Sequence, residues 1–177
     1  MALYMFGYGS LIAPKGLDGR GFSNAYRKSA NESGFFEQVL LQGYSRCTTN
    51  FGLKTGEYWS IYPNDLGSTW GMLFPIDPIN YRTIKMNEGA WFVKSKRKRY
   101  FRGYLMHEVV DCIEFSKRLN PGDLVFTVVY PFTHPQMNPD PMPLNRVYYN
   151  NCLSYAHSME AMGIYHEMKN YEKNHFS

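Results

Sequence analysis

The first eleven residues constrain the fold most strongly, because an apolar segment runs directly into a glycine-rich one. Residues 2–6 are predicted to form a buried strand, and the residues that follow form its turn. A glycine-rich turn after a strand exposes backbone N–H groups, which can hold a carboxylate or an oxyanion. The sequence thus predicts an anion-binding turn at the end of the first strand, formed by Gly7, Tyr8, Gly9, Ser10 and Leu11.

Length and composition predict one domain with a substantial core. The chain has 177 residues, of which 44% are apolar and 17% are aromatic. This apolar content is enough for one domain with a real core, and aromatic residues favour strands and line pockets. Because the sequence shows no internal repeat or domain boundary, we expect a single domain over residues 1–177.

The composition also argues against several classes of protein. The three cysteines are far apart, and neither they nor the five histidines have the spacing of a metal site. We therefore expect no metal, no cofactor and a reduced, cytoplasmic setting. The sequence shows no secretory signal and no apolar run of the ~18 residues that a membrane span needs. The net charge of +4 is mild and does not imply nucleic-acid binding.

Apolar, β-branched and aromatic runs predict further strands at residues 35–44, 58–62, 68–75, 90–94, 99–110 and 124–130. Two of these segments would form a hairpin whose tip is the basic stretch 94–99. Such a stretch is typical of a solvated tip, and the alternative is contact with an acidic partner or a nucleic acid. Residues 131–143 contain five prolines and are expected to form an ordered loop that borders a pocket.

The longest helical pattern follows the predicted strands, and shorter ones lie between them. Residues 78–87 are predicted to form a short helix, with Asp77 as its N-cap and Glu88 at its C-terminal edge. Residues 146–171 carry the longest helical pattern, and Gly163 interrupts it, so one helix or two fit this segment. A further short helix is expected near residues 24–28. The order of elements predicts an α+β fold, with a small mixed β-barrel flanked by helices.

Three blocks occur in order: FGYGSL at residues 6–11, Trp70-Gly71 at the start of an apolar run, and Asn87-Glu88-Gly89 after the short helix. Weaker blocks are residues 35–44 and the positions Tyr148, Cys152, Ala156 and Gly163. Together they resemble the gamma-glutamylcyclotransferase family, which has an AIG2-like fold. The resemblance covers nearly the whole chain and implies a small mixed barrel with helices around it.

The resemblance also implies a reaction. In this family the α-amine of a γ-glutamyl group attacks its own γ-carbonyl, 5-oxoproline forms, and the amine on the γ-carbonyl leaves. By resemblance, Glu88 is the general acid/base, and the turn at residues 7–11 binds glutamyl oxygens through its N–H groups. Tyr148 matches a tyrosine near the substrate, although Tyr149 is close to an equal choice. Phe92 and Tyr130 are further candidate substrate contacts.

Two functions from different classes fit these residues. The first is an active cyclotransferase, of the lyase or acyltransferase type, without metal or cofactor. The second is a catalytically inactive protein that binds a small ligand on the same fold. Glutathione, a γ-glutamyl amino acid and a γ-glutamyl amine all present the same glutamyl half, so the leaving group stays open, as does the oligomeric state.

Overall fold

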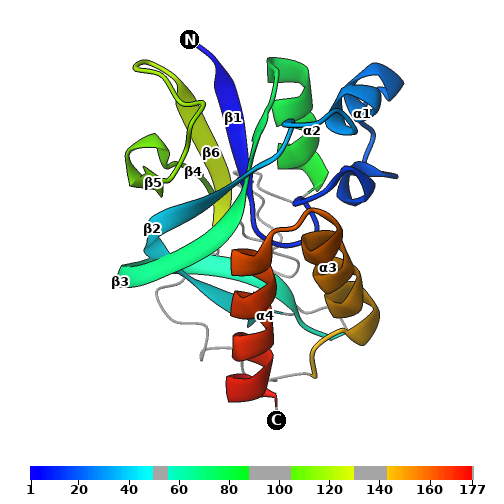
Figure 1. Cartoon of the computed structure of the whole chain (residues 1–177), viewed down its shortest axis with the longest axis vertical. Helices are drawn as coiled ribbons and strands as arrows, with labels where there is room; N and C mark the ends of the chain where they lie inside the picture. The colour runs from blue at the N-terminus through cyan, green and yellow to red at the C-terminus, as the bar shows by residue number, and fades with distance from the viewer. Residues whose placement is uncertain (50–55, 88–104, 130–142, 177) are drawn as a thin grey trace, which may run out of the picture.

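The computed structural model describes residues 1–49, 56–87, 105–129 and 143–176 (Figure 1). Most of the strands in this part of the chain precede two C-terminal helices. In order the elements are β1 (Leu3–Gly7), a 3₁₀ helix (Pro14–Leu17), α1 (Asn24–Ala30), β2 (Glu37–Thr49), β3 (Tyr58–Pro75), α2 (Pro78–Asn87), β4 (Leu105–Glu108), a 3₁₀ helix (Val110–Cys112), β5 (Ile113–Glu114), β6 (Leu124–Val129), α3 (Arg146–Ser158) and α4 (Met162–His175).

The six strands form one mixed sheet with the order β4-β6-β1-β3-β2-β5. β1 lies between a parallel neighbour, β6, and an antiparallel neighbour, β3. The long strands β2 and β3 are bent, so the sheet curls into half a barrel (Figure 1). α3 and α4 lie beside one end of this half-barrel, and α1 and α2 flank the other. The predicted α+β class is therefore confirmed, and the barrel is a half-barrel.

The prediction of two strands at residues 58–62 and 68–75 was wrong, because β3 is one strand from Tyr58 to Pro75. Residues 63–67 contain Pro, Asn, Asp and Gly, which are typical of a turn. Pairing with β2 on both sides of this segment keeps it in the strand as a bulge, opposite the register shift at Gln42 and Tyr44. Tertiary pairing thus overrides the local signal.

Other boundaries differ in smaller ways. β2 begins at Glu37 and continues to Thr49, five residues beyond the predicted end. In the segment 99–110, residues 105–108 form β4, whereas Val110 already belongs to a 3₁₀ helix. The hairpin strand at 90–94 and the basic stretch 94–99 lie outside the described residues, as does the proline-rich segment up to residue 142.

The C-terminal pattern contains two helices, and their boundary is not at Gly163. The chain turns at residues 159–161, where Glu160 has a φ of 55°. Gly163 instead lies in the first turn of α4, where a Cβ would come within 2.8 Å of the Trp70 indole. Glycine at this position lets α4 pack closely on β3.

α2 has the predicted bounds. The Asp77 carboxylate accepts a hydrogen bond from the Asn80 backbone N–H at 2.7 Å, which caps the helix as expected. Ile84 turns into the core, and Glu88, the next residue after the helix, lies outside the described residues. Among the described helices, none has the length and apolar character needed to cross a membrane.

Candidate active site

The turn after β1 approaches helix α3 closely. An added Cβ on Gly9 would lie 2.5 Å from the Tyr148 hydroxyl oxygen and 3.4 Å from Cβ of Trp59. A side chain at this position would therefore displace Tyr148, so glycine is required by the contact between turn and helix. The contact joins two of the sequence blocks, which are about 140 residues apart in the chain.

The turn keeps several backbone donors out of the sheet. Pairing of β1 with β3 ends at Gly7. Within the described part of the chain, the backbone N–H groups of Gly9, Ser10 and Leu11 donate no hydrogen bond to another residue. Backbone N–H groups in such a turn are suitable donors for an anion or a carbonyl oxygen.

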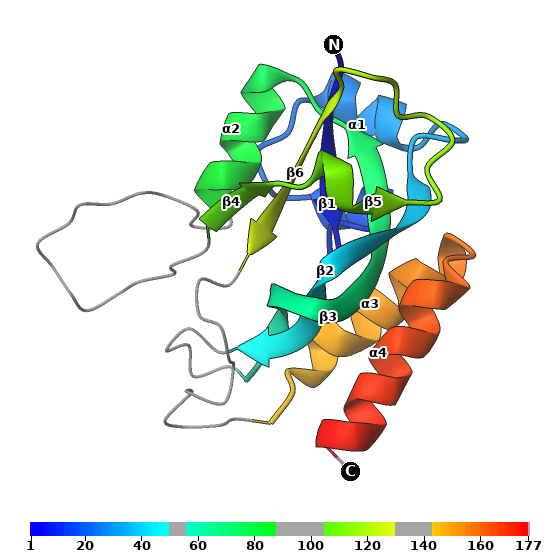
Figure 2. The same cartoon turned by 90° about the vertical axis from the view of Figure 1, so that its left-hand side faces the viewer.

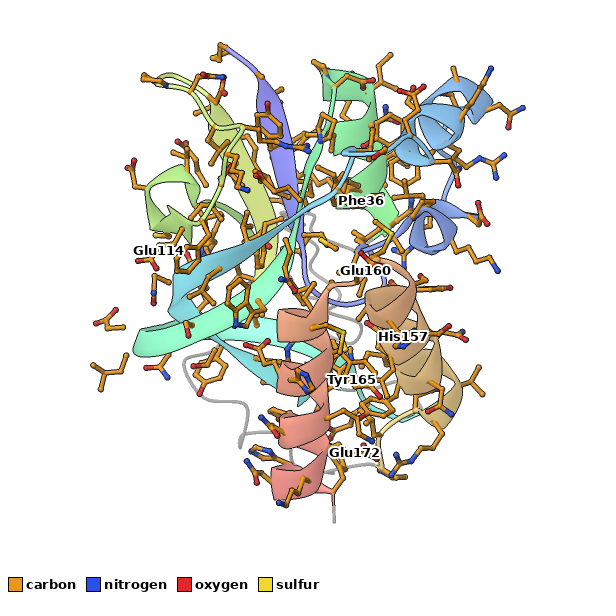
Figure 3. The ribbon with its side chains drawn as sticks, in the orientation of Figure 1. Phe36, Glu114, His157, Glu160, Tyr165 and Glu172 are labelled. Atoms are coloured by element: carbon orange, nitrogen blue, oxygen red, sulfur yellow. The ribbon has the colours of Figure 1, made fainter. Side chains whose placement is uncertain are left out.

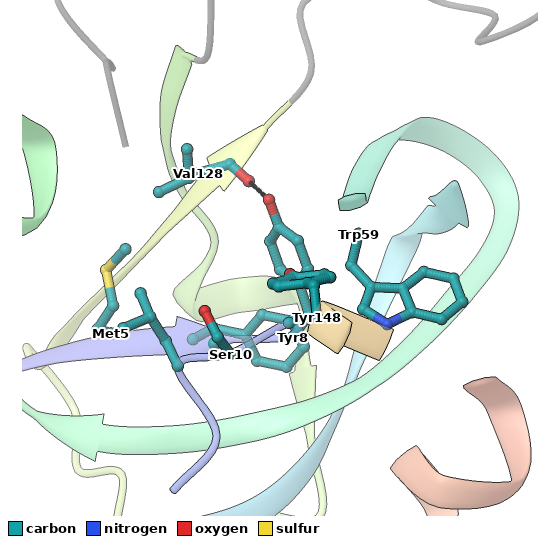
Figure 4. A pocket seen from close by; sticks show the side chains of 10 residues that line it. Met5, Tyr8, Ser10, Trp59, Val128 and Tyr148 are labelled. Atoms are coloured by element: carbon teal, nitrogen blue, oxygen red, sulfur yellow. Dashed lines mark hydrogen bonds between the residues drawn. The ribbon is translucent and has the colours of Figure 1, made fainter. Parts of the chain in front are cut away.

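A small pocket opens at this turn (Figure 4). Its interior is about 30 Å³, enough for one or two water molecules or a group of carboxylate size. The Tyr8 hydroxyl donates a 2.7 Å hydrogen bond to the Val128 carbonyl oxygen and so ties the turn to β6. The pocket lining consists of residues 5–11 together with Trp59, Val128 and Tyr148.

Adjacent tyrosines on α3 have separate environments. The side chain of Asn145 accepts a hydrogen bond from the Tyr148 N–H at 2.9 Å and caps the helix, which sets the first turn of α3 beside the pocket. The Tyr148 ring meets Tyr58 edge-on at a centroid distance of 4.8 Å. Tyr149 is 1% exposed and donates a 2.5 Å hydrogen bond to Glu172 of α4. Of the two candidates, Tyr148 lies at the pocket and Tyr149 lies between the helices.

The hydrogen bond between Tyr149 and Glu172 shifts the pKa values of both side chains. Burial, and then the neighbouring Glu172, raise the pKa of Tyr149. Hydrogen bonds from Tyr149 and then from Arg146 lower the pKa of Glu172 to about 2. Glu172 is therefore ionised at neutral pH and accepts hydrogen bonds rather than moving protons.

The buried Arg46 supports the turn from behind. Its side chain is 3% exposed, and its guanidinium donates to the Tyr8 carbonyl oxygen at 2.6 Å and to the Trp70 carbonyl oxygen at 2.9 Å. Its Nε donates to the Glu167 carboxylate of α4 at 2.6 Å. One cation thus holds the turn, β3 and α4 together. Sequence reasoning missed Arg46, because an arginine within a strand carries no local signal of its partners.

Arg20 links the turn to the end of α2. Its guanidinium donates a 2.6 Å hydrogen bond to Oγ of Ser10, and its backbone carbonyl accepts a hydrogen bond from the Asn87 side chain. Asn87 directly precedes Glu88 in the chain. Arg20 was missed as well, because it belongs to none of the sequence blocks.

Three predicted site residues, Glu88, Phe92 and Tyr130, lie outside the described residues. Of the others, the structure brings Gly7, Tyr8, Gly9, Ser10 and Leu11 together with Tyr148 around one pocket. Across the described ranges, no group of three or more His, Cys, Asp or Glu side chains is placed to hold a metal ion.

The chain resembles known proteins in its three-dimensional structure and not in comparisons of its sequence. No protein-family model matches the sequence, and no curated protein sequence matches it either. A solved structure described as a gamma-glutamyl cyclotransferase superposes with a TM-score of 0.60 at 17% identity, covering 96% of this chain and 86% of the other. An uncharacterized protein from Homo sapiens superposes with a TM-score of 0.55 at 19% identity, over 88% of this chain and 78% of that one.

A third solved structure, YkqA from Bacillus subtilis, has a TM-score of 0.52 and 20% identity, and covers 89% of this chain and 49% of its own. These similarities extend over most of the half-barrel and its helices, and they include a gamma-glutamyl cyclotransferase. They agree with the fold that the three sequence blocks implied. The chain therefore has the gamma-glutamyl cyclotransferase fold.

Proposed function

We propose that this chain is a cyclotransferase that releases 5-oxoproline from a γ-glutamyl compound. The observation that carries the proposal is the pocket at the end of β1, where the turn and the Tyr148 hydroxyl meet. The link from Ser10 through Arg20 to Asn87 supports a position for Glu88 near the same turn, because Asn87 is its neighbour in the chain.

The glutamyl half of the substrate is the part that this pocket suits. An interior of about 30 Å³ accepts a carboxylate or a carbonyl group, while the remainder of the substrate lies at the mouth. The N–H groups of Gly9, Ser10 and Leu11 are the donors for its oxygen atoms. Holding the chain of the glutamyl group at one end folds it toward ring closure, which is catalysis by positioning.

The chemistry needs one group that first accepts a proton and then returns it. Glu88 takes a proton from the substrate α-ammonium, and the free amine attacks the γ-carbonyl carbon to form the new C–N bond. The negative charge that develops on the carbonyl oxygen receives hydrogen bonds from the turn and from Tyr148. The original C–N bond then breaks as Glu88 protonates the departing nitrogen. Glu88 next takes the second proton, which the new ring nitrogen loses, and passes it to the released amine, which leaves as an ammonium. Protons balance over the cycle, and the nucleophile is supplied by the substrate.

The test is the rate of 5-oxoproline release, measured by mass spectrometry over a panel of γ-glutamyl amino acids, amines and peptides. Glu88→Gln keeps the side-chain shape but removes the base, so turnover on the best substrate should fall about 10²–10⁴-fold. Glu114→Gln is the matched control, because Glu114 is exposed at the edge of the sheet, away from α3 and α4 (Figure 3). Equal rates for wild type and Glu88→Gln would refute the role of Glu88.

The same panel also distinguishes an active cyclotransferase from an inactive protein that only binds a small ligand. If the wild type releases no 5-oxoproline from any compound, the same panel is tested for binding by calorimetry. Binding without turnover would replace the cyclotransferase with a small-ligand-binding protein on the same fold.

A further inference from the structure

A second, larger pocket is lined by residues of α2, β1 and β6. These three elements are neighbours in the fold (Figure 2). The volume of the pocket is about 700 Å³, within the range of sites that bind small organic molecules. We call this pocket the α2 groove. The residues that line it are Leu3, Pro78, Tyr81, Arg82, Lys85, Met86 and Phe126.

One stripe of α2 forms a wall of the groove. Its residues recur at positions 78, 81, 82, 85 and 86, which share one side of an α-helix. Ile84, on another side of the helix, is buried in the core. Tyr81 meets Phe126 edge-on at 5.1 Å between ring centroids, so aromatic rings join the helix to the strand. The floor of the groove is therefore apolar.

The charged groups of the groove are cationic. Arg82 and Lys85 are its charged lining residues, and no acidic side chain is among the described residues that line it. Neither cation forms an ion pair with another residue of the described ranges. Lys85 is half-buried, and lysines in such positions commonly lay an apolar stem on the protein surface and keep the ammonium in water. A ligand with an apolar body and an anionic group matches this arrangement.

The α2 groove leads toward the pocket at the turn. Side chains alternate along a strand, so Leu3 and Met5 of β1 share one face, as do Phe126 and Val128 of β6. Leu3 and Phe126 line the groove, whereas Met5 and Val128 line the small pocket. Two residues along a strand span about 7 Å. The two pockets therefore border the same pair of strands, one after the other along β1 and β6.

The direction of α2 agrees with this continuity. The chain enters the helix beside Leu3, whose carbonyl oxygen accepts a 2.9 Å hydrogen bond from the Ile76 N–H. It leaves the helix at Asn87, which is joined through Arg20 to Ser10. The helix thus accompanies β1 from the groove to the turn.

We infer that the α2 groove binds the leaving-group half of the substrate. It selects a γ-glutamyl compound whose departing amine carries a bulky apolar group and a carboxylate, with the apolar group against Tyr81 and Phe126 and the carboxylate near Arg82 and Lys85. This inference rests on the proposed cyclotransferase function.

The test compares three substrates by 5-oxoproline release: γ-glutamyl-phenylalanine, its C-terminal amide, and γ-glutamyl-alanine. The wild type should favour the first over each of the others by about tenfold in kcat/KM, because one lacks the charge and one lacks the apolar bulk. The double variant Arg82→Gln/Lys85→Gln should lose most of the preference over the amide, mainly through KM. Lys117→Gln, an exposed change beyond β5, is the control and should alter neither preference.

Equal kcat/KM values on the three substrates, or an equal loss on the acid and the amide in the double variant, would overturn the inference. Turnover of other γ-glutamyl compounds of the panel, but of none of these three, would also overturn the inference. If no compound of the panel is turned over, the proposed function fails, and calorimetry with N-acetyl-L-phenylalanine tests the α2 groove by itself. Binding by the wild type that weakens at least about fivefold in the double variant supports the groove as a site for apolar anions. Absent binding, or equal binding by both proteins, rejects it.

Discussion

Tyr148 and Tyr149 are neighbours on α3, but they belong to two regions that are built in opposite ways. Tyr148 places its hydroxyl over Gly9, in a pocket where the backbone N–H groups of Gly9, Ser10 and Leu11 donate to no described residue. Tyr149 places its hydroxyl on Glu172, in an interface where Arg146 and Lys169 also contact that carboxylate. Three backbone donors of the first region thus form no hydrogen bond within the described part of the chain. The polar groups of the second region hydrogen-bond to one another and join α3 to α4.

Trp59 forms the boundary between these regions. Its Cβ lies at the turn, 3.4 Å from the position of a Cβ on Gly9. Its ring contacts Tyr149 and Tyr171 at centroid distances of 5.9 and 5.2 Å. Substitutions on the two sides of Trp59 should therefore have different consequences, for activity on one side and for stability on the other.

The largest effect is expected at Arg46, which serves both regions. Arg46→Met removes the guanidinium from the Tyr8 carbonyl and leaves the Glu167 carboxylate without its buried partner. We expect the free energy of unfolding to fall by about 3–5 kcal/mol in urea denaturation. Arg146→Gln, at an ion pair whose arginine is 57% exposed, is the control and should cost less than about 1 kcal/mol. Similar losses in the two variants would show that Arg46 does not join the regions.

Arg46 also shows where sequence reasoning ends. Its three partners, Trp70, Tyr8 and Glu167, are 24, 38 and 121 residues away, and no local pattern encodes such distances. α2 was predicted with its bounds because Asp77 and Pro78 are adjacent signals. The bulge in β3 was mistaken for a turn, because its local composition is that of a turn and only pairing with β2 extends the strand. The turn and Tyr148 could be predicted to lie together because each belongs to a sequence block of the same family resemblance. Arg20 belongs to none of these blocks, so its place at the turn could not be predicted.

Tyr148→Phe should have the next largest effect, and it should act on activity. Under the proposed function, loss of the hydroxyl removes a donor to the developing oxyanion, so kcat/KM for 5-oxoproline release should fall about 10²-fold. The midpoint of urea unfolding should change little, because the ring and its contact with Tyr58 remain. An unchanged kcat/KM would remove Tyr148 from the site.

Tyr149→Phe should reverse this pattern. The variant leaves the ionised Glu172 without a short hydrogen bond, which should lower the free energy of unfolding by about 1.5–3 kcal/mol. Because Tyr149 lies behind Trp59, kcat/KM should stay within about twofold of the wild type under conditions where both proteins are folded. A large loss of activity with intact stability would mean that the two regions are coupled.

The smallest effect concerns pH and the helix interface alone. Hydrogen bonds from Tyr149 and Arg146 lower the pKa of Glu172 from its ordinary 4.5 to about 2 in the folded chain. The unfolded chain therefore takes up a proton on this group at a higher pH than the folded chain does. Stability from Glu172 is fully present above about pH 4.5 and is lost as the pH falls toward 2.

Urea unfolding of the wild type and of Glu172→Gln between pH 2 and 6 measures this contribution. The difference between the two proteins should be constant above about pH 5 and should shrink as the pH falls toward the folded pKa of about 2. In Tyr149→Phe the carboxylate loses its strongest donor, so the folded pKa of Glu172 should lie closer to 4.5. The pH-dependent loss of stability should then be smaller and should be complete at a higher pH than in the wild type. A difference that does not depend on pH would mean that packing of Glu172, and not its charge, holds α3 against α4. The region behind Trp59 would then be stabilised by the packing of its side chains and not by the charge of Glu172.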